Sequence, residues 1–179
     1  MRTFVLIFLT LFALTSFGQR SPLDRFLKKY DWNQGLTMKE INPGSTEFSD
    51  EFKMKGEAFD QAMASIDKVR IIKGDSASSS PGIRNAFFNE TYDIIRDKDY
   101  AALIHVHAND GENVGLYASK RKSGNISEFI FLMNGENSLL MIQIKGDIDI
   151  KEFPFGGIMQ ALSCGHGHSN CEGDPNSGD

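Results

Sequence analysis

The fold of this chain is constrained most strongly by alternating apolar and polar residues around an Asp-Gly turn signal, between Tyr100 and Ala118. Alternation of this kind indicates strands, and Asp110-Gly111 between two such strands predicts a β-hairpin. A two-residue loop would pair His107 with Val114 and mix polar and apolar side chains on one face. A three-residue loop, with Gly111 in the left-handed conformation, pairs Val106 with Val114 and keeps the two kinds of side chain apart. We therefore predict the longer loop.

In that register the apolar side chains of the hairpin share one face, which we expect to be buried: Ala102, Ile104, Val106, Val114, Leu116 and Ala118. The opposite face carries a polar cluster of His105, His107, Asn113 and Tyr117. The two histidines would lie about 7 Å apart and could share a metal ion if a third ligand came from Asn113, Tyr117 or a helix. Polar residues on the second face of a sheet are the alternative interpretation.

Two further segments extend the hairpin into a four-stranded antiparallel meander. The segment Ile126–Met133 is apolar on both faces, which is typical of an interior strand that is covered on both sides. In the next segment Leu140, Ile142 and Ile144 alternate with Met141, Gln143 and Lys145, and residues 134–137 form a tight turn between the two strands. We expect the N-terminal half, a partner chain or a ligand to cover the second face.

The N-terminal half is predicted to mix helices and strands. Ser21-Pro22 and Ser80-Pro81 each supply a cap followed by a first-turn proline, and they predict helices over 22–30 and 81–96. Apolar patterning predicts strands over 35–41 and 67–73 and helical segments over parts of 48–64 and 147–162, with Phe52, Phe59 and Met63 as core candidates. The resulting class is α+β, in which packed helices accompany an antiparallel sheet made of the C-terminal meander and the N-terminal strands.

The two ends of the chain are predicted to lie outside this domain. Arg2 precedes an apolar run over residues 4–14, which is shorter than the roughly 20 residues that span a bilayer, and small residues follow at positions 16 and 18. We interpret 1–18 as a secretory signal peptide, 19–162 as a single domain and 163–179 as a flexible tail rich in Cys, His and Gly. We expect a periplasmic or secreted protein without a lipid anchor and, after signal cleavage, without a membrane span. The net charge of −5 argues against nucleic acid as a partner.

The tail contains the most unusual segment of the chain, formed by Cys164, His166, His168 and Cys171. Two thiolates and two imidazoles could bind zinc or copper(I), and the intervening glycines would let a short loop wrap an ion. Export favours a disulfide between Cys164 and Cys171, which would remove the thiolate ligands. The two functional interpretations compete, and free thiols in an unstructured segment are the third alternative. A metal ion is the one cofactor that we consider.

Short motifs add little further chemistry. Asp75-Ser76-Ala77 resembles the three-residue acceptor pattern of Bacteroidota O-glycosylation, which makes Ser76 a candidate modification site. The sequence contains no nucleophile elbow, no phosphate-binding glycine loop, no dinucleotide fingerprint and no zinc-protease motif. No catalytic residues are therefore assigned.

Five segments are similar to the family of small exported Bacteroidota proteins defined by domain of unknown function 4252: Leu23–Phe26, Ile66–Ile72, Asp110–Tyr117, Ile126–Leu132 and Ile144–Ile148. The resemblance extends roughly from Leu23 to Phe153 and implies an envelope or secreted protein. It carries over no active-site residues, and the Cys/His tail lies outside it.

Three functions are compatible with these observations. The first is an exported, non-enzymatic accessory or binding protein whose partner is an envelope protein or an apolar ligand. It is favoured by the strand that is apolar on both faces and by the absence of a catalytic motif. The second is a metal-handling protein that uses the C-terminal Cys/His tail. The third is an enzyme whose site lies near His105 and His107.

Overall fold

The computed structural model describes residues 21–43, 64–98, 100–107 and 112–151. The chain divides into two units between Asp31 and Trp32, and each unit is described by itself. Several sequence predictions lie outside the described residues: the signal peptide, the core candidates Phe52, Phe59 and Met63, the left-handed Gly111, and the segment 152–179 with its cysteines and histidines.

The first unit contains helix α2 (Pro22–Lys29). Its N-terminus is formed as predicted, because Ser21 Oγ accepts a hydrogen bond from the backbone N–H of Asp24 at 3.2 Å and proline occupies the first turn. Apolar side chains spaced four apart, Leu23 and Leu27, are both buried. Phe26 and Tyr30 contact each other edge to face on the same helix.

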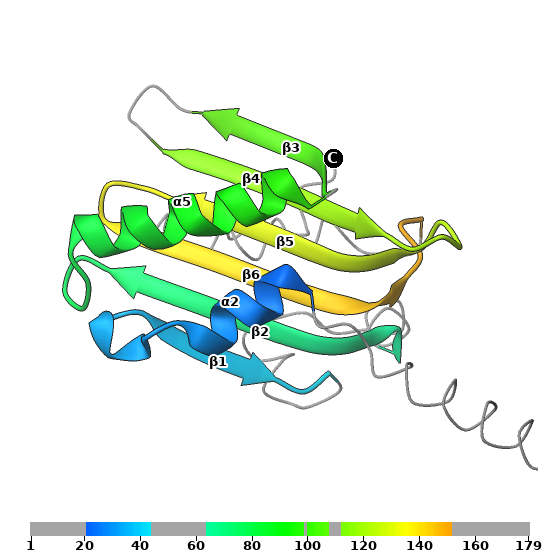
Figure 1. Cartoon of the computed structure of the whole chain (residues 1–179), viewed down its shortest axis with the longest axis horizontal. Helices are drawn as coiled ribbons and strands as arrows, with labels where there is room; N and C mark the ends of the chain where they lie inside the picture. Colours follow the sequence, from blue (N-terminus) through cyan, green and yellow to red (C-terminus); the bar gives the residue numbers. More distant parts are fainter. Residues whose placement is uncertain (1–20, 44–63, 99, 108–111, 152–179) are drawn as a thin grey trace, which may run out of the picture. The chain divides into compact units, whose positions relative to one another are not determined.

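The second unit is built on one six-stranded sheet in the order β1-β2-β6-β5-β4-β3 (Figure 1). All neighbouring strands are antiparallel. The strands are β1 (Thr37–Ile41), β2 (Ile66–Asp75), β3 (Ala101–His107), β4 (Asn113–Lys120), β5 (Ile126–Asn134) and β6 (Ser138–Ile148), and a short 3-10 helix (Trp32–Gln34) precedes them. The α+β class and the C-terminal meander are confirmed. The pairing of β2 with β6 joins the N-terminal strands to that meander.

The predicted hairpin register is confirmed near the turn and changes further along β3. Val106 pairs with Val114 and Ile104 with Leu116, as expected. A bulge then makes Leu103 an extra residue, so Ala101 rather than Ala102 lies opposite Ala118. The pattern of apolar residues could not indicate this shift, because both residues before the bulge are alanines.

The sheet has two apolar faces. On one of them the buried side chains form a continuous core across β2, β6, β5 and β4, which includes Val69, Ile142, Phe131 and Leu116. We call this the core-cluster face. Alternate residues of the same strands, such as Ile72, Met141 and Ile130, are buried on the other face. β5 lies inside the sheet and is buried along most of its length, as its apolar sequence predicted.

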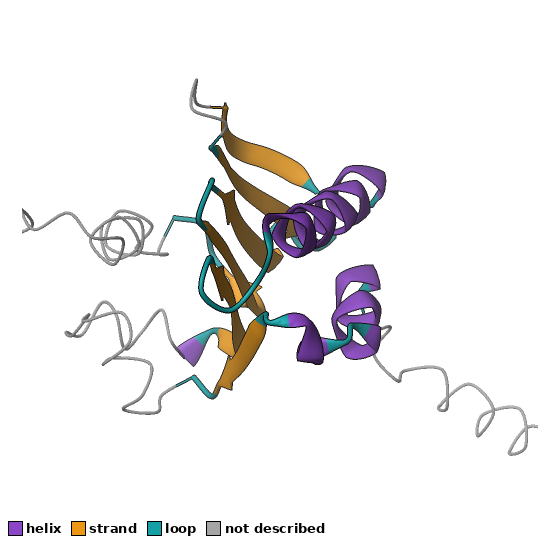
Figure 2. Ribbon diagram, turned by 90° about the vertical axis from the view of Figure 1, so that its left-hand side faces the viewer, coloured by secondary structure: helices purple, strands orange, loops and turns teal. Residues whose placement is uncertain are grey.

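Helix α5 (Pro81–Asp97) lies along the second face, which we call the α5 face (Figure 2). Ser80 caps the helix, with its Oγ accepting from Ile83 N at 3.4 Å, and Pro81 begins the first turn. The buried residues Phe87, Thr91 and Ile95 recur at intervals of four along the helix. The prediction of a helix over 81–96 is confirmed to within one residue.

Two expectations are wrong. The segment from residue 147 is not helical at its start, because β6 continues through Ile148 and remains paired with β5 there. The six apolar residues of the hairpin are not all buried: those of β4 are buried or half-buried, whereas Ala102, Ile104 and Val106 of β3 are exposed. β3 is the outermost strand on its side of the sheet, and alternation alone does not reveal which strand will occupy that place.

Candidate functional site

The most exposed apolar surface in the described part of the sheet belongs to β3. All seven residues of the strand are exposed. Leu103, Ile104 and Val106 are 38%, 40% and 51% exposed as whole residues. They account for three of the five large exposed hydrophobic residues among the described segments. Scattered exposed apolar residues are ordinary, but three on one short strand form a patch.

The patch has one free edge. β4 pairs with β3 on one side, and no further strand lies beyond β3 among the described residues. Every second residue of an outer strand directs its backbone N–H and C=O groups away from the sheet. β3 contains no charged residue and no proline, so it lacks the usual features that block pairing with another strand.

On the α5 face, β3 and β4 contribute to a cluster of three rings. Tyr92 of α5 lies 5.9 Å from His105 and 6.3 Å from Tyr117, and the latter two are 6.3 Å apart, measured between ring centroids. A Cβ atom at Gly115 would lie 2.4 Å from the ring of Tyr117, so this ring occupies the space over the glycine. Burial, with a smaller effect of Tyr92, raises the pKa of Tyr117 above its usual value. The ring cluster therefore joins α5 to the β3–β4 end of the sheet.

The predicted polar cluster is assembled on one face, with its histidines in separate contacts. His107 pairs with Asn113 across the hairpin, and its Nδ1 lies 2.5 Å from the amide oxygen Oδ1 of Asn113. His105 instead contacts the rings of Tyr92 and Tyr117. Within the described segments, no group of three or more His, Cys, Asp or Glu side chains is placed to hold a metal ion.

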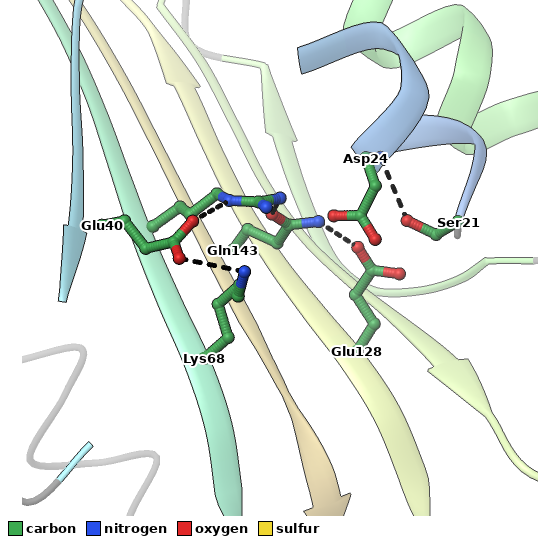
Figure 3. A network of polar contacts seen from close by, with 7 residues as sticks. Ser21, Asp24, Glu40, Lys68, Glu128 and Gln143 are labelled. Carbon is green, nitrogen blue, oxygen red and sulfur yellow. Dashed lines mark hydrogen bonds and ion pairs between the residues drawn. The ribbon is translucent and has the colours of Figure 1, made fainter. Parts of the chain in front are cut away.

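A row of polar side chains crosses the α5 face from Glu40 of β1 to Glu128 of β5 (Figure 3). Glu40 forms ion pairs with Lys68 at 3.0 Å and Arg70 at 2.9 Å. Arg70 Nη1 donates to Gln143 Oε1 at 2.9 Å. Glu128 accepts from Gln143 Nε2 at 2.5 Å and from the hydroxyl of Tyr100 at 2.7 Å. These contacts connect four strands of the sheet.

The interior half of this row is almost completely buried, with Gln143 0% and Glu128 3% exposed. Buried polar groups are costly unless they are hydrogen-bonded, and here each group satisfies its neighbour. At the outer end, the hydrogen bonds from Arg70 and then Lys68 hold the pKa of Glu40 below its usual value. We interpret the row as a structural element that fixes the strand register.

Sequence reasoning did not find this row, although one signal for it exists. Arg70 interrupts the apolar run 69–72 of β2 and Gln143 the apolar run 139–144 of β6, and they lie opposite each other once the register is known. Glu40 lies opposite Arg70 from the other side. Matching polar interruptions between strands could therefore have suggested the contact.

Arg84 is a second buried polar residue that the sequence did not single out. It is 1% exposed and lies in the first turn of α5. Its Nη1 donates to the carbonyl oxygens of Ser79 and Asp75, and its Nη2 donates to that of Glu136 at 2.7 Å. The guanidinium thereby joins the loop before α5 to the turn between β5 and β6. Its partners are backbone oxygens, so we assign it a structural role.

The candidate modification site lies in an ordered turn. Asp75 Oδ1 accepts hydrogen bonds from the backbone N–H groups of Ala77 and Ser78 and from the Ser78 hydroxyl, at 2.8–3.0 Å. The bonds from Ser78, first that of its hydroxyl, lower the pKa of Asp75. Ser76 at the tip of this turn is exposed. Cys164, His166, His168 and Cys171 lie outside the described residues.

No helix within the described ranges is long and apolar enough to cross a membrane.

We compared the chain with protein-family models, curated proteins and solved structures. Neither the curated proteins nor the solved structures contain a significant match to the chain. A family model described as "Domain of unknown function (DUF4252)" matches residues 30–154. The match contains every strand of the sheet and helix α5. It begins at residue 30, after helix α2, whereas the resemblance expected from the sequence began at Leu23. The chain belongs to the DUF4252 family.

Proposed function

We propose that this protein is an exported, non-enzymatic binding module and that its binding surface is the exposed edge of β3. The observation that carries the proposal is the seven-residue outer strand that is exposed throughout and lacks Lys, Arg, Asp and Glu, with three large apolar side chains. A partner would add an extended strand to this edge, gaining backbone hydrogen bonds and covering the apolar side chains.

The surroundings of β3 support this proposal because they hold the strand in place without covering it. The ring cluster joins β3 and β4 to α5, and the His107–Asn113 contact joins the two strands near the hairpin turn. A rigid edge loses little conformational entropy when a partner binds. The large polar groups of the α5 face bind one another, which fits a structural role better than a catalytic one.

Site-specific photocrosslinking in cells that export the protein tests the proposal. A photoreactive side chain would replace Val106 on β3 or, as a control, Met38 on β1; both native residues are large, apolar and exposed on outer strands. We expect a discrete adduct with a protein from position 106 and not from position 38. The absence of an adduct from position 106, or the same adducts from both positions, would refute binding through β3.

Export itself is tested by the N-terminus of the purified protein. We expect the exported form to begin at Gln19, because Ser16 and Gly18 match the small residues of a cleavage site. An intact N-terminus on protein confined to the cytoplasm would contradict this part of the proposal.

A further inference from the structure

The two outer strands of the sheet differ in a way that bears on the partner. On β1, Lys39 and Glu40 are exposed, and Glu40 is ion-paired with Lys68 and Arg70. Charged residues on an outer strand disfavour edge-to-edge pairing, because pairing would desolvate them. β3 contains no Lys, Arg, Asp or Glu along its seven residues. One edge of this sheet is therefore protected against pairing and the other is not.

We propose that the strand that pairs with β3 is the β3 of a second copy of this chain, in a symmetric antiparallel dimer. This inference rests on the proposed function, since it names the partner of the same edge. It predicts a continuous sheet through two protomers.

The symmetry of antiparallel pairing supports a second copy. A two-fold axis perpendicular to the sheet reverses the direction of a strand but leaves its two faces on their own sides. Ile104 and Val106 of one copy would therefore meet apolar residues of the other on the core-cluster face, beside Leu116 of β4. His105 and His107 would meet the polar side of the second strand. The edge is in this sense complementary to itself.

The protected edge explains why the assembly would stop at two copies. Pairing β3 with β1 of another copy would leave a free edge at each end and extend into a fibre. It would also place Lys39, which lies on the core-cluster face with Ile41, beside Ile104 or Val106. Pairing of two β3 edges avoids this burial of charge, and among the described strands it leaves the charged β1 edges as the unpaired ones.

The size of the edge sets the expected strength of the dimer. Seven residues at about 3.4 Å each give an edge roughly 24 Å long, which is short for a permanent interface. We therefore expect a reversible dimer with a dissociation constant in the micromolar range, on the order of 1–100 μM.

Sedimentation equilibrium of protein purified from an exporting host tests the inference, with Val106→Lys and Ile104→Lys as the disrupting variants. Met38→Lys is the matched control, because it introduces the same charge at an exposed apolar position on the other outer strand. Circular dichroism and urea unfolding would first confirm that each variant folds. Amide hydrogen exchange at low and high protein concentration provides a second measurement.

We expect the wild type and Met38→Lys to dimerise with similar dissociation constants, and both β3 variants to bind at least about tenfold more weakly. Amide protection should rise with concentration on β3 and not on β1. A wild-type protein that remains monomeric at about 100 μM, or β3 variants that dimerise normally, would overturn the inference. A monomeric protein that still crosslinks from position 106 to a different protein would overturn the dimer alone and leave the proposed binding function intact.

Discussion

Replacing Arg84 by Met tests whether this buried cation stabilises the fold. The unbranched methionine side chain retains much of the apolar stem of arginine but removes its donors. Three backbone carbonyl oxygens would lose a hydrogen bond, those of Asp75, Ser79 and Glu136. Because these oxygens lie in two separate connections, the substitution loosens the loop before α5 from the turn between β5 and β6.

The three losses are unequal. The Asp75 oxygen also accepts from the backbone N–H and the hydroxyl of Ser79, both at 2.9 Å, so it remains bonded. Ser79 is buried, and leaving its carbonyl oxygen without this donor costs about 1–3 kcal/mol. Glu136 is exposed, so water replaces the lost donor there at a cost of about 1 kcal/mol. Removing the buried guanidinium, whose Nε has no hydrogen-bond partner, returns about 1 kcal/mol. The net destabilisation is about 1–3 kcal/mol.

Urea unfolding followed by circular dichroism measures this difference, which corresponds to a fall in melting temperature of about 2–12 °C for a chain of this size. Arg96→Met is the matched control on the same helix, because Arg96 is 63% exposed and forms surface ion pairs with Asp93 and Asp97. We expect the control to cost less than about 0.5 kcal/mol. An Arg84→Met protein destabilised no more than the control would refute the assigned role.

Three further predictions concern a glycine and two titrating groups. Gly35→Ala should destabilise the protein by about 2 kcal/mol more than Gly124→Ala in urea unfolding. Both glycines have a positive φ (+90° and +98°), but only at Gly35 would a Cβ atom meet a backbone oxygen, that of Ser78 at 1.8 Å. Equal losses of stability in the two variants would contradict this prediction. The raised pKa of Tyr117 predicts that its phenol ionises at a higher pH than an ordinary tyrosine and that its contribution to stability is lost as pH rises through the raised pKa. A spectrophotometric titration unchanged by Tyr117→Phe would rule this out. The lowered pKa of Glu40 predicts a contribution that is present above its unfolded value near 4.5 and lost as pH falls through the folded one. Because the Glu40 side chain is 43% exposed, Glu40→Gln should reduce the acid-dependent part of the unfolding free energy by less than about 1 kcal/mol. A larger loss would show that the ion pairs of Glu40 contribute more to stability than expected for exposed pairs.

The elements of this protein follow closely from local sequence signals. The Ser-Pro pairs before α2 and α5 predict where those helices begin, because a capping hydroxyl and a first-turn proline act within a few residues. The pairing of Val106 with Val114 follows from keeping apolar and polar side chains on separate faces. The interior place of β5 follows from its apolar residues on both faces. Each of these inferences needs only neighbouring residues or one hairpin.

Contacts between distant strands did not follow in the same way. The row from Glu40 to Glu128 requires the order β1-β2-β6-β5, and alternation within a strand says which side chains share a face but not which strand lies beside it. The role of Arg84 requires the turn at Glu136 to lie near the start of α5. Both contacts depend on which segments pack side by side in the fold. The local sequence signals are compatible with many different strand orders, so they do not reveal these contacts.

Sequence alone determined the helices α2 and α5 and the strands of the C-terminal meander except the end of β6, together with the two faces of the hairpin and the side on which His105 and His107 lie, because these depend on spacing along the chain. Only the tertiary structure decided that β3 occupies the outer place in the sheet and that Ile104 and Val106 remain exposed. The reason is that burial depends on what packs against a side chain, and an apolar residue on an uncovered edge has the same sequence pattern as one in a core.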